Sequence, residues 1–60
     1  MTIIATARKA IKTALKKNQI ERDTSAMHRV AVEATSGMHH NQTVIAELAW
    51  SAVMDVYLGR

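Results

Sequence analysis

The segment from Val44 to Leu58 contains only three polar residues, spaced four apart: Glu47, Ser51 and Asp55. In a helix, at about 100° per residue, they fall on a strip about 80° wide and leave the rest of the cylinder apolar. A helix that packs against one neighbour needs an apolar stripe of only about 100°. A membrane span needs about 18 apolar residues with few charges, and this run is shorter and carries two acids. The segment therefore predicts a helix at the centre of a bundle and no membrane insertion.

The residues before this segment predict a second helix that pairs with it. Asn41 or Thr43 can cap the start of the C-terminal helix, and Gly59 is a favoured residue just after its end. Gly37 is placed to stop a preceding helix. Five apolar residues upstream follow one-sided helical spacing: Met27, Val30, Ala31, Ala34 and Met38. Because a short turn joins them, residues 23–36 and 42–58 are expected to form an antiparallel helical hairpin.

The N-terminal segment repeats the helical pattern on a different face. Its apolar positions, after Thr2 as a helix cap, are Ile4, Ala7, Ile11, Ala14 and Leu15. Carried forward at about 100° per residue, this stripe lies nearly opposite the one that contains Met27. Either the helix breaks within residues 17–19 or 23–25, or one long helix uses both faces. The absence of proline favours a long, kinked N-terminal helix that reaches across a partner subunit, whereas the Asp-Thr-Ser sequence at 23–25 favours a break.

Size and composition favour a single all-α domain, residues 1–60, that self-associates. A chain of 60 residues buries only about 60% of its unfolded surface, and no cysteine is present to supply disulfides. The hairpin is therefore expected to dimerise into a helical bundle with no stable folded monomer. Trp50 and Tyr57, seven apart, are expected to stack within the core. The residues expected at the core or dimer interface are Ile45, Leu48, Ala49, Trp50, Ala52, Val53, Val56 and Tyr57.

No residue pattern indicates catalysis or a cofactor. His39 and His40 are expected to point in different directions in an exposed turn, and no cysteine or nearby carboxylate completes a metal site with them or with His28. The serines lack a nucleophile motif, and there is no glycine-rich phosphate loop. We therefore expect no catalytic residue, no cofactor, no metal and no enzymatic activity.

The positive charge is concentrated in residues 1–17, which carry no acid. The basic residues there are Arg8, Lys9, Lys12, Lys16 and Lys17. Lys9, Lys12 and Lys16 share one helix face, opposite the apolar stripe, and could contact nucleic-acid phosphates or an acidic partner. An ordinary solvated face is the interpretation that we favour. The early charges also leave no apolar stretch for a signal peptide, so a cytoplasmic protein is expected.

Residues 33–45 resemble the turn between the two helices of ribbon-helix-helix repressors, in which a glycine ends one helix and a polar residue caps the next. The resemblance implies a dimer whose paired strands enter the DNA major groove. The strand would be residues 17–22, with Lys17, Gln19 and Glu21 facing the DNA. A dimeric DNA-binding regulator of this type is the alternative function.

The chain as a whole, from MTIIATARKAIKTALKKNQ to AELAWSAVMDVYLGR, is similar to small accessory early proteins of lambda-like phages, encoded between the recombination and excision genes. This resemblance implies expression in the bacterial cytoplasm and a role, exerted through protein contacts, in host physiology or the lysis–lysogeny choice. It implies no particular site residue. The main expectation is a small homodimeric helical regulatory protein that binds a host or phage protein.

Overall fold

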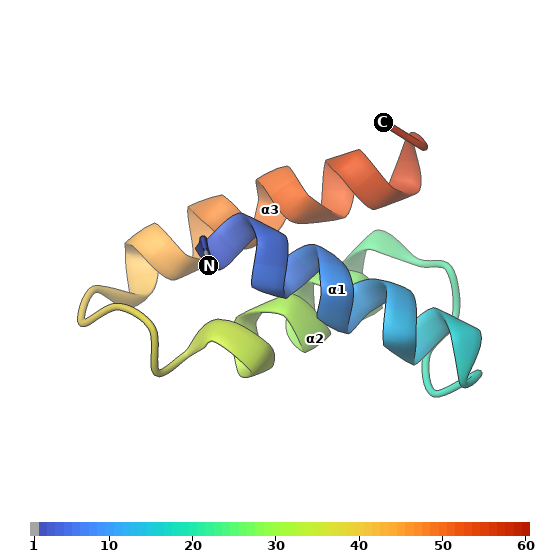
Figure 1. Ribbon diagram of the computed structural model, residues 1–60, viewed down its shortest axis with the longest axis horizontal. Coiled ribbons are helices and arrows are strands. Elements are labelled where there is room, and N and C mark those ends of the chain that lie inside the picture. Colours follow the sequence, from blue (N-terminus) through green and yellow to red (C-terminus); the bar gives the residue numbers. More distant parts are fainter. Residues whose placement is uncertain (1) are drawn as a thin grey trace.

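The computed structural model describes residues 2–60 and shows three helices that each pack against the other two (Figure 1). These helices are α1 (Ile3–Lys16), α2 (Thr24–Thr35) and α3 (Gln42–Tyr57). The bundle measures 30 × 21 × 21 Å. Residues 2–60 contain no strand, so the all-helical prediction is confirmed. Within this part of the chain no helix combines the length and the apolarity that crossing a bilayer would require.

α1 begins at a cap and ends at a left-handed residue. The backbone N–H of Ala5 donates to the Thr2 hydroxyl oxygen at 3.1 Å. At the other end Asn18 has φ 56°, and the N–H of Gln19 reaches back to the Ala14 carbonyl at 2.9 Å. This hydrogen bond, together with the one from the Asn18 N–H to the Leu15 carbonyl, forms a Schellman motif, in which asparagine is the commonest substitute for glycine.

The long N-terminal helix that we favoured from the sequence is therefore wrong, and the break lies at residues 17–19, one of the two places left open. Residues 17–23 form an irregular connection of turns and bends, with Ile20 partly buried against the core. Asp23 then caps α2, because its Oδ2 accepts from the N–H of Ala26 at 3.2 Å. The break explains the opposed apolar stripes, since each helix turns its own stripe toward one shared core.

α2 and α3 form the expected hairpin, with ends set by local capping. Asn41 rather than Thr43 is the cap of α3: its Oδ1 accepts from the N–H of Thr43 at 2.9 Å. The C-terminal end is a second Schellman motif, in which Gly59 has φ 73° and the N–H of Arg60 donates to the Asp55 carbonyl at 2.8 Å. The predicted role of Gly59 is thus confirmed.

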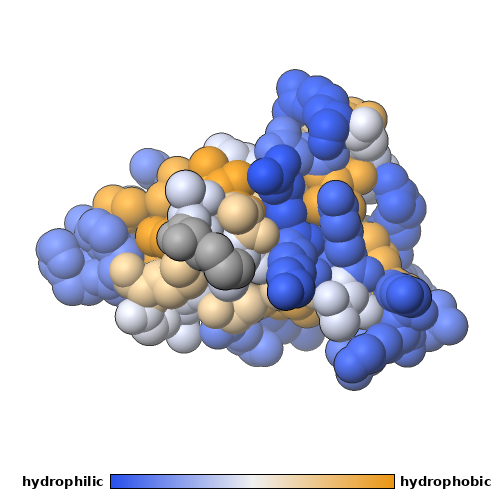
Figure 2. Space-filling model, in the orientation of Figure 1, coloured by the Kyte–Doolittle hydropathy of each residue, from blue (hydrophilic) through white to orange (hydrophobic). Residues whose placement is uncertain are grey.

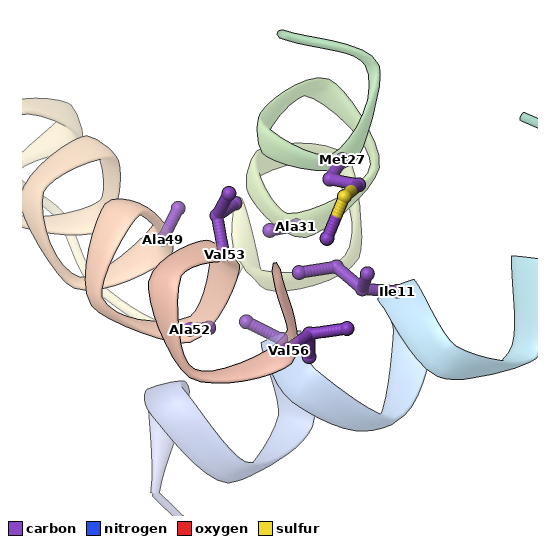
Figure 3. Packing of buried hydrophobic residues seen from close by; sticks show 8 residues of the cluster. Ile11, Met27, Ala31, Ala49, Ala52, Val53 and Val56 are labelled. Carbon is purple, nitrogen blue, oxygen red and sulfur yellow. The ribbon is translucent and has the colours of Figure 1, made fainter. Parts of the chain in front are cut away.

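The core draws on all three helices and is rich in alanine, which lets the helix backbones approach closely. Figure 3 shows Ile11 of α1 and Met27 of α2 pointing toward one another beside Val56 of α3. Thr35 is also fully buried, and its hydroxyl donates to the Ala31 carbonyl at 2.7 Å. The buried apolar residues are Ala7, Ile11, Ala14, Met27, Ala31, Ile45, Ala49, Ala52, Val53 and Val56.

Candidate binding surfaces

The residues predicted for the core or dimer interface divide into two groups. Five of them are buried within the single chain, namely Ile45, Ala49, Ala52, Val53 and Val56. Leu48 is half-buried, whereas Trp50 and Tyr57 are exposed. The first group is covered because α1 folds back as a third helix beside the hairpin. These buried residues are core residues of one chain and are not available to a partner.

Trp50 and Tyr57 are not a core pair, and in this respect the sequence interpretation is wrong. Their exposed fractions are 43% and 44%. The Trp50 ring stacks on His28, with 4.2 Å between the ring centroids and 19° between the planes. His28 Nε2 lies 3.1 Å from the carbonyl oxygen of Ala46, which can only accept, so Nε2 carries the proton. His28 is thus a packing residue between α2 and α3.

Arg22 holds the α1–α2 connection to the end of α3. Its Nη2 donates to the carbonyl oxygens of Val56 and Tyr57, each at 3.1 Å. The guanidinium carbon lies 5.9 Å from the centre of the Tyr57 ring. The Val56 carbonyl also accepts from the N–H of Gly59 at 3.3 Å, so Arg22 adds to the hydrogen bonds that close this end. A cation at a helix C-terminus is also favoured by the helix dipole. Sequence reasoning missed this contact because it spans more than thirty residues, and local spacing carries no signal for it.

The basic face of α1, which we define as Lys9, Lys12 and Lys16, is exposed as predicted, and Lys17 beside it is exposed too. Within residues 2–60 none of these four lysines forms an ion pair. Arg8 differs: it is half-buried, and its Nη1 lies 3.8 Å from Asp55 Oδ2 on α3. Arg60 approaches the other Asp55 oxygen, also at 3.8 Å. In the view of Figure 2, strongly hydrophilic side chains cover much of the right-hand part of the surface with apolar patches between them, and further hydrophilic side chains cover the left end.

The histidines of the α2–α3 turn are arranged differently from the prediction. The rings of His39 and His40 stack, with centroids 4.5 Å apart and planes at 19°, rather than pointing apart. His39 Nδ1 accepts a hydrogen bond from the backbone N–H of Asn41 at 2.9 Å. This ring nitrogen is therefore already engaged within the turn. His28 lies elsewhere, in the middle of α2. Among the described residues no group of three or more potential ligand side chains is placed to hold a metal ion.

The strand required by the ribbon-helix-helix resemblance is not formed, since residues 17–22 are turns, bends and irregular backbone. Several of these residues instead surround an open depression together with the end of α1. It is lined by Leu15, Asn18, Gln19, Ile20, Glu21 and Arg22. The depression is shallow and brings together neither a nucleophile and a base nor a set of metal ligands.

Comparisons of the chain with protein-family models, with curated proteins and with solved structures find no match. The resemblance to phage accessory proteins therefore stays a prediction. The surfaces that the fold presents are the basic face of α1 and the exposed aromatic residues of α3, and function is argued from these.

Proposed function

We propose that this protein is a small helical regulatory protein that acts as a homodimer by binding an acidic surface on another protein. The observation that carries the proposal is the basic face of α1, whose three lysines are exposed and free of ion pairs within residues 2–60. At a rise of about 1.5 Å per residue, the row spans about 10 Å along the helix axis. Charged rows of this kind steer encounter with surfaces of opposite charge and favour one orientation.

The packing of α1 makes this row a fixed surface. Ala7, Ile11 and Ala14 on the opposite face are almost completely buried. Both ends of the helix are closed by local hydrogen bonds, at Thr2 and at Asn18. The apolar face that an interfacial membrane helix would insert is therefore already occupied by the core. The lysines are presented to a partner without a requirement for the helix to fold on binding.

The same geometry favours a protein partner over a nucleic acid. Arginine, which reads base edges and grips phosphates with two parallel hydrogen bonds, is absent from the face, because Arg8 is turned toward Asp55. The exposed aromatic rings lie on α3, where they contact residues 22 and 28, and so are not interleaved with the lysines. Nucleic-acid contact through the lysines alone would carry no sequence information.

The homodimer in this proposal is supported by the apolar side chains that one chain leaves in water on α3. Trp50, Tyr57 and Leu58 are all exposed. Aromatic residues of this kind anchor protein interfaces. The phage resemblance adds the expectation that the partner is a host or phage protein and that the protein works in the bacterial cytoplasm. Nothing in the proposal calls for a catalytic group or a cofactor.

The experiment compares Lys9, Lys12 and Lys16 changed together to Gln with the same three changed to Arg. The wild type and the Arg variant should retain a protein partner from nuclease-treated bacterial lysate, and the Gln variant should lose it. With the purified partner, the loss should be about 1–2 kcal/mol, or roughly tenfold in Kd, for three partly screened charges. Circular dichroism should show the same helix content in all three proteins.

A titration with a 30-base-pair duplex tests the alternative. The alternative would be supported if the protein binds the duplex with micromolar affinity and if the slope of log K against log salt concentration falls by about one for each lysine removed. The partner would then be a nucleic acid instead of a protein. If the wild type and the Gln variant bind the partner equally, the lysines are ordinary solvated residues without a binding role, and the proposal is refuted.

A further inference from the structure

We infer that the acidic partner presents an α-helix to the basic face of α1, and that this helix carries three carboxylates on one side, spaced three and four residues apart. The inference rests on the proposed function and names the kind of element that the lysines bind. It concerns the outer side of α1 alone, and the exposed side chains of α3 take no part in it.

The spacing of the lysines matches that of side chains on a second helix. Lys9 and Lys12 are about 4.5 Å apart along the axis of α1, Lys12 and Lys16 are about 6 Å apart, and all three fall within about 60° around it. Carboxylates three and four residues apart on another helix repeat both spacings within the same angle. On an extended chain, side chains of one face recur about every 6.6 Å, so three of them span about 13 Å instead of about 10 Å. The row of lysines therefore favours a helix.

A helix also suits a surface that offers no backbone hydrogen bonds. An extended peptide typically gains affinity by adding a strand to the edge of a sheet. Residues 2–60 contain no strand, and the backbone groups in the middle of α1 are bonded within the helix. A partner helix satisfies its own backbone and needs only side-chain contacts from α1.

The side chains between the lysines are small, which lets a second helix approach. Thr13 lies between Lys9 and Lys16 on the surface, and Ala5 lies one turn before Lys9. The aliphatic stems of the lysines can therefore lie along the sides of the contact while the charged ends reach the carboxylates. In the view of Figure 1, α1 lies in front of α2 and α3, so its outer side is not covered by another described element. Two helices can pack there at the usual distance of about 8–10 Å between their axes.

The charge of α1 requires an acidic occupant. Residues 1–17 contain basic residues and no acid. Within residues 2–60, the only one of these basic residues in an ion pair is Arg8, which pairs with Asp55 on α3. The charges of the basic face are therefore not neutralised by this part of the chain. A helix with three aligned carboxylates neutralises them one for one and fixes its own orientation on α1.

Three exposed ion pairs by themselves give weak binding. Each pair should change Kd by a factor of about 1.5–5 at ordinary salt concentrations. An isolated acidic helix is therefore expected to bind with a Kd on the order of 1 mM. The surface around that helix in the whole partner supplies the remaining affinity. NMR titration measures binding in this range and also locates it on the chain.

The test is a titration of the ¹⁵N-labelled protein with three peptides of equal charge and about 18 residues, at about 50 mM salt. The aligned peptide carries glutamates at i, i+4 and i+7 of an alanine-rich helix. The dispersed peptide carries them at i, i+5 and i+10, on three different sides of the helix. The extended peptide keeps the aligned spacing but has glycine in place of alanine, which prevents helix formation. The aligned peptide should bind about threefold or more tighter than either control, with shifts concentrated in residues 9–17.

Lys12→Gln and Lys17→Gln are a matched pair of variants for the same titration. Each removes one exposed lysine that forms no ion pair within residues 2–60, but Lys17 lies about 100° around α1 from the row. Lys12→Gln should weaken binding of the aligned peptide by about two- to fivefold, and Lys17→Gln should leave it nearly unchanged. Equal losses in the two variants would show that net charge, and not the row, governs binding, and would overturn the inference.

Equal binding of the aligned and dispersed peptides, equal binding of the aligned and extended peptides, or no binding of any of them would also overturn the inference. The proposed function is tested separately, by the retention of a partner from lysate. If the triple Gln variant loses its partner while the peptides bind equally, the partner is acidic but does not present an aligned helix. If that variant keeps its partner, the proposed function fails and the inference fails with it.

Discussion

Asn18 decides where the first helix ends. It adopts φ 56°, a conformation that costs residues with a side chain about 1–2 kcal/mol and that asparagine tolerates better than most. We expect Asn18→Ala to lower the free energy of unfolding by about 1 kcal/mol, because alanine lacks the local hydrogen bonding that eases this conformation. Asn18→Gly should equal or exceed the wild type. Urea unfolding of the three proteins measures this, and an alanine variant as stable as the glycine variant would contradict the assignment.

His28 governs the environment of Trp50, the single tryptophan of the chain. The imidazole covers one face of the indole and donates to the Ala46 carbonyl. His28→Ala should shift the tryptophan emission to longer wavelength, since the ring gains contact with water, and should destabilise the fold by about 1 kcal/mol through the lost hydrogen bond and stack. His28→Phe, which keeps a stacking ring but no donor, should leave the emission close to the wild type. Identical spectra for His28→Ala and the wild type would show that the stack is not formed in solution.

At the scale of the elements, Arg22 connects the α1–α2 link to the last turn of α3. Because its Nη2 donates to the carbonyls of Val56 and Tyr57 at the end of α3, Arg22→Gln should lower the free energy of unfolding by about 1 kcal/mol at most, since Arg22 is exposed to solvent. Amide hydrogen exchange should accelerate in residues 55–58 more than in α1. Arg29→Gln, an exposed arginine of α2 without such contacts, is the control. Uniform acceleration across the three helices would mean that Arg22 acts on global stability alone.

At the scale of the whole molecule, the three helices close a core within one chain. The expectation that no folded monomer exists depended on a two-helix hairpin that left Ile45 and Val53 in water, and both are fully buried here. We therefore expect Leu58→Asp, which changes a residue that is 58% exposed, to leave a folded chain. The wild type should gain thermal stability above its dimerisation Kd.

Val53→Asp provides the contrast within the same helix. This change places an unpaired charge in the core, which costs several kcal/mol against a total stability of about 5–15 kcal/mol, so the chain should be mostly unfolded at any concentration. Circular dichroism at 1 and 100 µM separates the two variants. A helical Val53→Asp protein would show that the core does not need this position.

Local features were predictable because their causes lie within a few residues. The apolar rows of the three helices, the cap at Thr2 and the end at Gly59 follow from side-chain periodicity and from hydrogen bonds that span one turn. The start of α3 was predicted only as Asn41 or Thr43, and the structure decided for Asn41. The exposed lysines of α1 were predictable for the same reason, as residues opposite an apolar row. Asn18 was the exception among local features, since asparagine can continue a helix or end it and its neighbours do not decide between the two.

The contacts that complete the molecule were decided only by the tertiary structure. Arg8 with Asp55, Arg22 with the end of α3, and His28 with Trp50 each join residues far apart in the chain. Periodicity treats every apolar position of α3 alike, so it could not separate Val53, which α1 and α2 cover, from Trp50 and Tyr57, which they leave exposed. An apolar face in a sequence shows that something must cover it, but which part of which chain does so depends on how the helices are placed in space.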